Sequence, residues 1–288
     1  MTNQTGLLHL LNDASLPYRD PLARLNWEGL DLDAWWLPPN ALSLSGVPEF
    51  ESLPHAARRR VSRFELVHLL ETELWLESVF MRHLSGALEG SEAAVRSRYL
   101  HEIREEAGHS LMFLELMDRS GIRIPEAHRH RPLIPRLVSK HVGIDSALFW
   151  GLAVIGEELP DKLNRAVRQT NGDAAVSAVV YHMATLRIMD ESRHIALARA
   201  SFTAASRRLA GWQRLFQSTV LSSVLRAFAR CLFFPPAVVY QAAGLDRPRT
   251  WRQRALTNSK RRRQAEQAVK PTFDFLRDQG WRVRKLHG

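Results

Sequence analysis

Apolar residues recur every three or four positions through most of the chain after residue 60, which is the spacing of amphipathic helices. Turns containing glycine interrupt this pattern and divide it into segments. The segments predict helices over about 61–86, 91–120, 144–170 and 173–209, with a fifth over about 212–233. Prolines in 122–142 predict a long crossover between the second helix and the third. No alternating strand pattern competes with this interpretation.

Two helical hairpins joined by a long crossover are the arrangement of ferritin-like bundles. The pattern therefore predicts an all-α fold, with a four-helix bundle over residues 61–245. Residues 1–60 are rich in proline and predict an irregular segment that wraps the bundle, while residues 246–288 predict a basic C-terminal tail with extra helices.

The composition favours a cytoplasmic globular protein without a membrane span. The chain has 288 residues, of which 45% are hydrophobic, so it can bury a large core. Cys231 is the only cysteine, which excludes an internal disulfide and is typical of a reducing compartment. No uncharged apolar run reaches 18 residues, and the first residues lack a signal-peptide pattern.

The formal net charge is +10, and much of the excess lies near the C-terminus, with its tightest cluster at Lys260–Arg263. Such a segment can bind nucleic acid, an anionic membrane or an acidic carrier protein. It lacks the interleaved aromatic residues that stack on bases. We therefore expect a solvated basic helix and tail, and nucleic acid is not the expected partner.

Two predicted helices carry a glutamate followed three residues later by a histidine. The second helix has Glu106 and His109, and the fourth has Glu191 and His194. Residues three apart lie on one face of a helix, so each pair can reach the same metal ion. One such pair is common by chance, but two copies on the partner helices of two hairpins indicate a shared site.

The same plan supplies two more carboxylates. Glu71 lies 35 residues before Glu106, and Glu157 lies 34 residues before Glu191, so each hairpin offers Glu and then Glu-x-x-His. The apolar stripe favours Glu71 over its neighbour Glu73, and it does not choose between Glu157 and Glu158. Four carboxylates and two imidazoles without a thiolate form the ligand set of bundle proteins with two iron or two manganese ions.

The residues beside the two central glutamates have two open interpretations. Glu105 precedes Glu106, and Asp190 precedes Glu191. Each can accept a hydrogen bond from a histidine that binds metal, or it can face solvent.

On these residues the sequence resembles the AurF-like di-iron oxygenases, the p-aminobenzoate N-oxygenase family. The resemblance covers about residues 40–210 and rests on ETELWLES, REEAGH, WGLAVIGEEL and RIMDESRH. It implies as metal ligands the six residues Glu71, Glu106, His109, Glu157, Glu191 and His194, and it favours Glu157 over Glu158. The family has a further histidine ligand at the position that Arg187 occupies in this chain. Arg187 can instead pair with a nearby carboxylate or point towards a carboxylate substrate.

The resemblance implies an oxygenase with two iron ions, manganese being the alternative metal. It implies N-oxygenation of an amine, with other oxidations of a small organic substrate left open. Such an enzyme needs O2 and an external electron donor, and a homodimer is compatible with the sequence. The alternatives are a ferroxidase or a manganese catalase of the ferritin-like class, and a basic helical binding module that has lost its metal.

Overall fold

The computed structural model describes residues 2–125, 140–170, 176–284 and 286. Over these residues the chain is helical, and its only β-type pairing is an isolated bridge between Trp35 and Val176. The all-α prediction is confirmed. The centre of the predicted crossover and the first residues of the predicted fourth helix lie outside the described residues.

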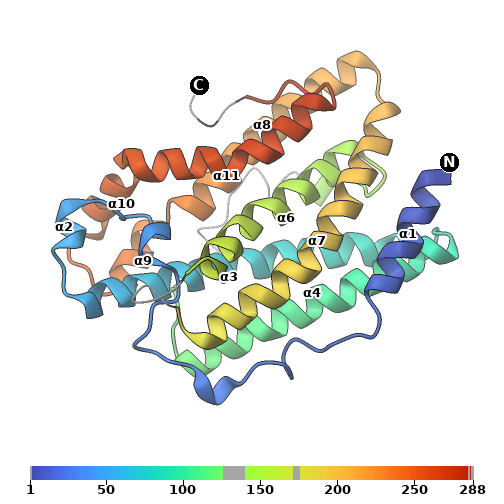
Figure 1. Cartoon of the computed structure of the whole chain (residues 1–288). Helices are drawn as coiled ribbons and strands as arrows, with labels where there is room; N and C mark the ends of the chain where they lie inside the picture. Colours follow the sequence, from blue (N-terminus) through green and yellow to red (C-terminus); the bar gives the residue numbers. More distant parts are fainter. Residues whose placement is uncertain (1, 126–139, 171–175, 285, 287–288) are drawn as a thin grey trace.

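Four long helices form the bundle as two hairpins (Figure 1). They are α3 (His55–Gly86), α4 (Ala93–Ser120), α6 (Ala147–Arg168) and α7 (Ala178–Arg207). The pair α3 and α4 and the pair α6 and α7 each pack side by side, and the two pairs meet through α3 with α6 and α4 with α7. This arrangement brings the inner faces of all four helices to one core.

Local signals set the ends of these helices. The Ser146 hydroxyl accepts a hydrogen bond from the backbone N–H of Phe149, which caps the start of α6. Gly121 follows α4 with φ of 64°, a left-handed conformation in which glycine meets no steric penalty. The turn between α3 and α4 is short, so the two helices are held antiparallel and close.

The described part of the C-terminal region adds four helices, two of which cover α6. These are α8 (Gly211–Phe233), α9 (Ala237–Ala242), α10 (Pro248–Thr257) and α11 (Ser259–Asp278). In Figure 1, α8 and α11 run above α6, and both contact it. Within Gly211–Ala242 a stretch of 18 residues is apolar enough to cross a membrane, with a mean hydropathy of 1.3, but 56% of that stretch is buried inside the protein. Helix α8 therefore packs part of its surface against the core.

The N-terminal region follows the outside of the bundle. It contains α1 (Thr2–Ala14), the 3-10 turns Trp27–Gly29 and Pro39–Ala41, and α2 (Pro48–Glu51). Helix α1 packs on α4 and α7. Further along, Tyr18 and Pro21 lie so close to Gly108 of α4 that an added Cβ would come within 3.0 Å of both. The wrap therefore closes over the part of α4 that carries the predicted ligands.

The N-terminal and C-terminal regions contact each other and α3 through a buried polar network. The Glu65 carboxylate of α3 accepts hydrogen bonds from the backbone N–H and the hydroxyl of Ser43, and that hydroxyl lies 2.7 Å from the Tyr240 hydroxyl. Arg261 of α11 donates to the carbonyl oxygens of Phe233 and Ala41. The described part of the basic segment thus packs onto the protein through α10 and α11.

We predict that Gly156→Ala destabilises the fold by about 1–3 kcal/mol, because an added methyl group would push against side chains of α3 and strain their packing. A Cβ at this position of α6 would come within 2.8 Å of the Leu76 side chain and 3.0 Å of Phe80 on α3. Gly86→Ala, at the exposed end of α3, is the matched control because a Cβ there meets no atom within 4 Å. Urea unfolding of both variants measures the difference, and equal midpoints would contradict this packing.

Candidate metal centre

Carboxylates and imidazoles from all four bundle helices converge in the core. Helix α3 contributes Glu77, α4 contributes Glu106 and His109, α6 contributes Glu157, and α7 contributes Glu191 and His194. Each of these residues is at most 7% exposed. Ionisable side chains are stable at such depth only when they are paired, protonated or bound to metal.

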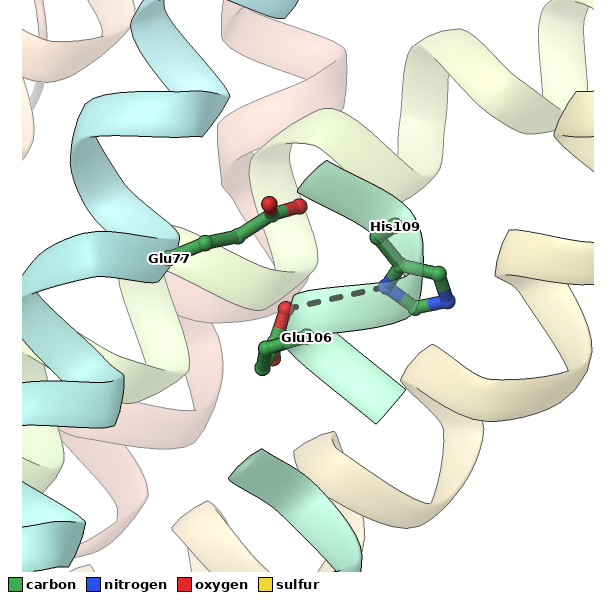
Figure 2. A group of neighbouring side chains, drawn as sticks. All are labelled: Glu77, Glu106 and His109. Atoms are coloured by element: carbon green, nitrogen blue, oxygen red, sulfur yellow. Dashed lines mark ion pairs between the residues drawn. The ribbon is translucent and has the colours of Figure 1, made fainter. Parts of the chain in front are cut away.

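Two groups of donor atoms share one residue. Glu77, Glu106 and His109 form the first group, whose donor atoms all lie within 4.8 Å of one another. Figure 2 shows their side chains pointing into a common space between α3 and α4. Glu106, Glu157 and His194 form the second group by the same measure. Because Glu106 belongs to both, its carboxylate can bridge two ions, one in each group.

Glu191 comes from α7 and is fully buried. Its Oε2 atom lies 4.0 Å from His194 Nδ1. Its Oε1 atom accepts a hydrogen bond from Arg187 at 2.5 Å. Glu191 therefore faces the second group through one oxygen, while the other is held by the guanidinium.

Each histidine is held by a carboxylate from the other hairpin. His109 Nε2 of α4 lies 3.0 Å from Asp190 Oδ2 of α7, and His194 Nε2 of α7 lies 2.9 Å from Glu105 Oε2 of α4. A neutral imidazole that donates from Nε2 presents the Nδ1 lone pair to a metal. Of the two interpretations of Glu105 and Asp190, the structure shows the one in which they orient histidines.

Arg193 connects the two orienting carboxylates. Its Nη2 atom lies 3.0 Å from Glu105 Oε1 and 2.6 Å from Asp190 Oδ1. Arg98 adds a second hydrogen bond to Glu105 at 3.2 Å. The guanidinium charges and the neighbouring histidines hold the pKa values of Glu105 and Asp190 below their usual range, despite the opposing effect of burial. Both side chains therefore stay ionised acceptors.

The unpaired polar atoms of the cluster match what metal ions would bind. The buried atoms without a hydrogen-bond partner include His109 Nδ1, His194 Nδ1, Glu77 Oε1 and Glu191 Oε2. Buried polar atoms are rarely left without partners unless an ion or another group completes them. The donor types, oxygen and imidazole nitrogen, suit iron or manganese. The residues thus fit a pair of metal ions.

Burial and mutual repulsion set the protonation of the cluster. Burial raises the pKa values of Glu77 and Glu157 well above their usual range, and the carboxylates beside them raise these further. Burial lowers the pKa of His109, but the hydrogen bond to Asp190 and the ion pair with Glu106 outweigh it and raise the value to about 10. In the absence of a metal, protons supply part of the positive charge that the carboxylates require.

The structure does not bring Glu71 into the cluster. Its side chain is partly exposed and lines a groove with Leu111 and Leu114 on the outer side of α3 and α4. Glu77 lies with Glu106 and His109 instead, and Glu73 of the same face contacts Arg187. The placement expected for Glu71 is thus corrected, because the inward stripe of α3 runs through Leu66, Leu69, Glu73, Glu77 and Phe80.

The structure places Glu157, and not its neighbour Glu158, in the cluster. Glu157 is part of the second donor group. Glu158 points elsewhere, where its carboxylate accepts hydrogen bonds from Arg199 and from the hydroxyl of Thr272 in α11. The structure therefore brings together Glu106, His109, Glu157, Glu191 and His194 as expected. Metal binding by these residues remains a prediction.

A small cavity borders the second donor group. It has a volume of about 20 Å³, and among its lining residues are Glu102, Phe80, Phe149 and Trp150, beside Glu106, Glu157 and His194. A wholly apolar cavity of about 30 Å³ shares Phe80 and Phe149 with it. Among the described residues that line either cavity, none is a lysine or an arginine.

Comparison with known proteins agrees with this geometry. A model of the family "P-aminobenzoate N-oxygenase AurF" matches residues 5–280. Two mycobacterial relatives, "Uncharacterized protein Mb0909" of Mycobacterium bovis and "Uncharacterized protein Rv0885" of Mycobacterium tuberculosis, are each 22% identical over 235 residues. Each match covers 79% of this chain and 68% of the relative. These names assign no substrate.

We predict that Glu77→Gln lowers the amount of bound metal by about half, since it removes a donor from one of two positions. Glu71→Gln is the matched control on the same helix, and it should retain the full metal content because its side chain faces the outer groove. Metal analysis after reconstitution with Fe2+ or Mn2+ compares the two proteins. Loss of metal from the Glu71 variant alone would contradict the arrangement.

We predict that the metal-free protein becomes less stable as the pH rises from about 6 to about 9. The pKa values of Glu73 and Glu102 are raised from 4.5 to about 7, and that of His109 from 6.5 to about 10. Groups with a raised pKa stabilise the folded state below their unfolded pKa, and this contribution is lost as the pH passes the folded value.

Thermal unfolding of the metal-free protein across this range measures the effect. Saturation with Mn2+ should reduce the pH-dependent loss, because the ions replace the protons as the compensating charge. An apo protein whose melting temperature rises with pH over this interval would contradict the charge balance.

Proposed function

We propose a function from the premise that the chain belongs to the p-aminobenzoate N-oxygenase AurF family. At the level of this family the chain is an oxygenase with a di-iron centre. We infer that the centre lies at the two donor groups joined by Glu106. The observation that carries this inference is the pair of histidines whose Nε2 atoms are held by carboxylates and whose Nδ1 atoms both face Glu106, at 3.6 Å for His109 and 3.0 Å for His194.

Each part of the cluster has a distinct role in this proposal. Glu77 and His109 would hold one ion, and Glu157 and His194 the other, with Glu106 shared and Glu191 facing from α7. When two ferrous ions are bound, the centre supplies activation of O2. Asp190 and Glu105 keep the imidazoles oriented, and the surrounding apolar helices exclude water. Manganese is the alternative metal.

The cavity beside Glu157 and His194 indicates where a substrate would bind. Its aromatic wall of Phe80, Phe149 and Trp150 suits an apolar molecule. Glu102 lines the same space, and its Oε1 atom has no hydrogen bond and lies 3.5 Å from Arg98 Nε, so it can accept a hydrogen bond from an amine N–H. A negatively charged carboxylate would find no lysine or arginine among the described lining residues. We therefore propose a small apolar amine without a carboxylate group.

The size of the cavity sets a further condition. About 20 Å³ holds little more than a water molecule. The rings of Phe80 and Phe149 line both this space and the second cavity, with their centroids 6.2 Å apart. We infer that these side chains would have to move before a larger molecule could bind. This apolar approach favours an organic substrate over the passage of iron that a ferroxidase requires.

The proposed reaction is N-oxygenation. An amine, one O2, two electrons and two protons give a hydroxylamine and one water, with one oxygen atom forming the new N–O bond. The two electrons come from an external donor, such as a reductase or a small electron carrier. The protein's own contribution is to hold the metal, to place the amine nitrogen beside the centre and to keep bulk water out.

Two matched substrates test this proposal. The iron-loaded protein, supplied with a chemical reductant and O2, should convert p-toluidine into its hydroxylamine, detected by mass spectrometry. p-Aminobenzoate has a similar size but carries a carboxylate, so we expect its turnover to be slower by about tenfold or more, because a buried charge without a partner is costly. Faster oxidation of p-aminobenzoate would overturn the assignment of substrate class.

A variant at the shared glutamate separates metal chemistry from background oxidation. Glu106→Gln removes the donor common to both groups, so it should lose most of the bound metal and all amine oxygenation. Product formation by this variant at the wild-type rate would contradict the role of the centre.

A further inference from the structure

Arg187 places a permanent cation beside the cluster. It is 5% exposed, and its guanidinium lies over the Phe113 ring, with 4.9 Å from Cζ to the ring centroid. Its Nη1 atom donates to Glu73, and its Nη2 atom donates to Glu191 Oε1 at 2.5 Å. The Nη2 atom also lies 3.8 Å from Glu77 Oε1. The side chain thus binds carboxylates of α3 and α7 at once.

This cation is not placed equally with respect to the two donor groups. Among the described residues, Arg187 pairs with Glu191 through Oε1 and leaves Oε2, the oxygen that faces His194 of the second group, and it pairs with neither Glu157 nor His194. In the first group its Nη2 atom faces Glu77 Oε1, the carboxylate oxygen that Ser110 does not hold. Like charges repel strongly in a buried, weakly screened site, so a metal beside Glu77 and His109 meets an opposing charge.

Glu73 reduces the repulsion between Arg187 and a metal ion in the first donor group. It is 1% exposed, it lies one turn before Glu77 on α3, and its Oε2 atom pairs with Arg187. A guanidinium held by Glu73 is partly neutralised and partly drawn away from Glu191 and Glu77. The Glu73–Arg187 pair therefore sets how much positive charge faces the first donor group.

We propose that the two metal positions have unequal affinities, with Arg187 weakening the one at Glu77, Glu106 and His109. The position at Glu106, Glu157 and His194 fills first. The second ion binds more weakly, and Glu73 tunes its affinity by restraining Arg187. This inference rests on the proposed function only in that the cluster binds two divalent ions.

Metal titration tests the inequality without measuring activity. The metal-free wild-type protein is titrated with Mn2+, and free Mn2+ is followed by its electron paramagnetic resonance signal. We expect two binding steps whose dissociation constants differ by about tenfold or more. Two equal steps would overturn the proposal while leaving the dimetal site intact, whereas the absence of Mn2+ and Fe2+ binding would overturn the proposed function itself.

Variants of Arg187 and of Glu73 should change the dissociation constant of the weaker binding step in opposite directions. Arg187→Leu should tighten the second ion by about tenfold or more, and Glu73→Gln should weaken it by a similar factor. The double variant Arg187→Leu with Glu73→Leu removes the ion pair without leaving one partner unpaired, so it should fall between the Arg187 variant and the wild type. A second step unchanged in all three folded variants would refute the role of Arg187.

Two controls make the outcome specific. Arg187→Lys keeps the positive charge and should keep two unequal steps. Arg199→Leu removes another arginine of α7, whose partner is Glu158 outside the cluster, and should leave both steps unchanged. Circular dichroism melting curves establish that each variant is folded, and the double variant remains informative if Arg187→Leu alone fails to fold.

Discussion

Carboxylates buried inside an apolar bundle require positive charge, and this requirement organises the core of the protein. Glutamates from four helices approach one another at depths where water does not screen their repulsion. The compensating groups are Arg187 and the imidazoles of His109 and His194, together with protons or metal ions. A centre of this kind is stable only when its positive partners are present, so its occupancy and the stability of the bundle are coupled.

The two hairpins depend on each other for the geometry of this centre. The histidine of α4 is oriented by α7, and the histidine of α7 is oriented by α4, while Arg193 joins the two orienting carboxylates. Neither hairpin could present a correctly turned imidazole by itself. The repeated Glu-x-x-His plan thus produces a symmetric arrangement whose halves complete one another, and the extensive packing between α6 and α7 supports it.

Sequence reasoning recovered the helices and the two Glu-x-x-His pairs because helical spacing alone fixes which residues share a face. It placed Glu157 correctly in the core through the resemblance. It misplaced the α3 residue, because Val67, Leu70 and Leu74 also form an apolar stripe, and α3 has buried residues on more than one side. The choice of Glu77 depends on how α3 is rotated against α4, which spacing does not determine. Likewise, the pattern left the direction of Arg187 open, since its contacts with Glu73 and Glu77 join residues far apart in the chain.

The network around Glu65 limits how far the chain could be shortened. Ser43 from the N-terminal wrap and Tyr240 from the C-terminal region complete its hydrogen bonds, and Arg261 adds the nearest compensating charge. Removal of the N-terminal flank would take away the hydrogen bonds from Ser43, and removal of the C-terminal flank would take away Arg261, so either cut would leave the buried Glu65 incompletely compensated. A minimal four-helix scaffold cut from this protein would therefore need an apolar residue in place of Glu65 before it could be expected to fold.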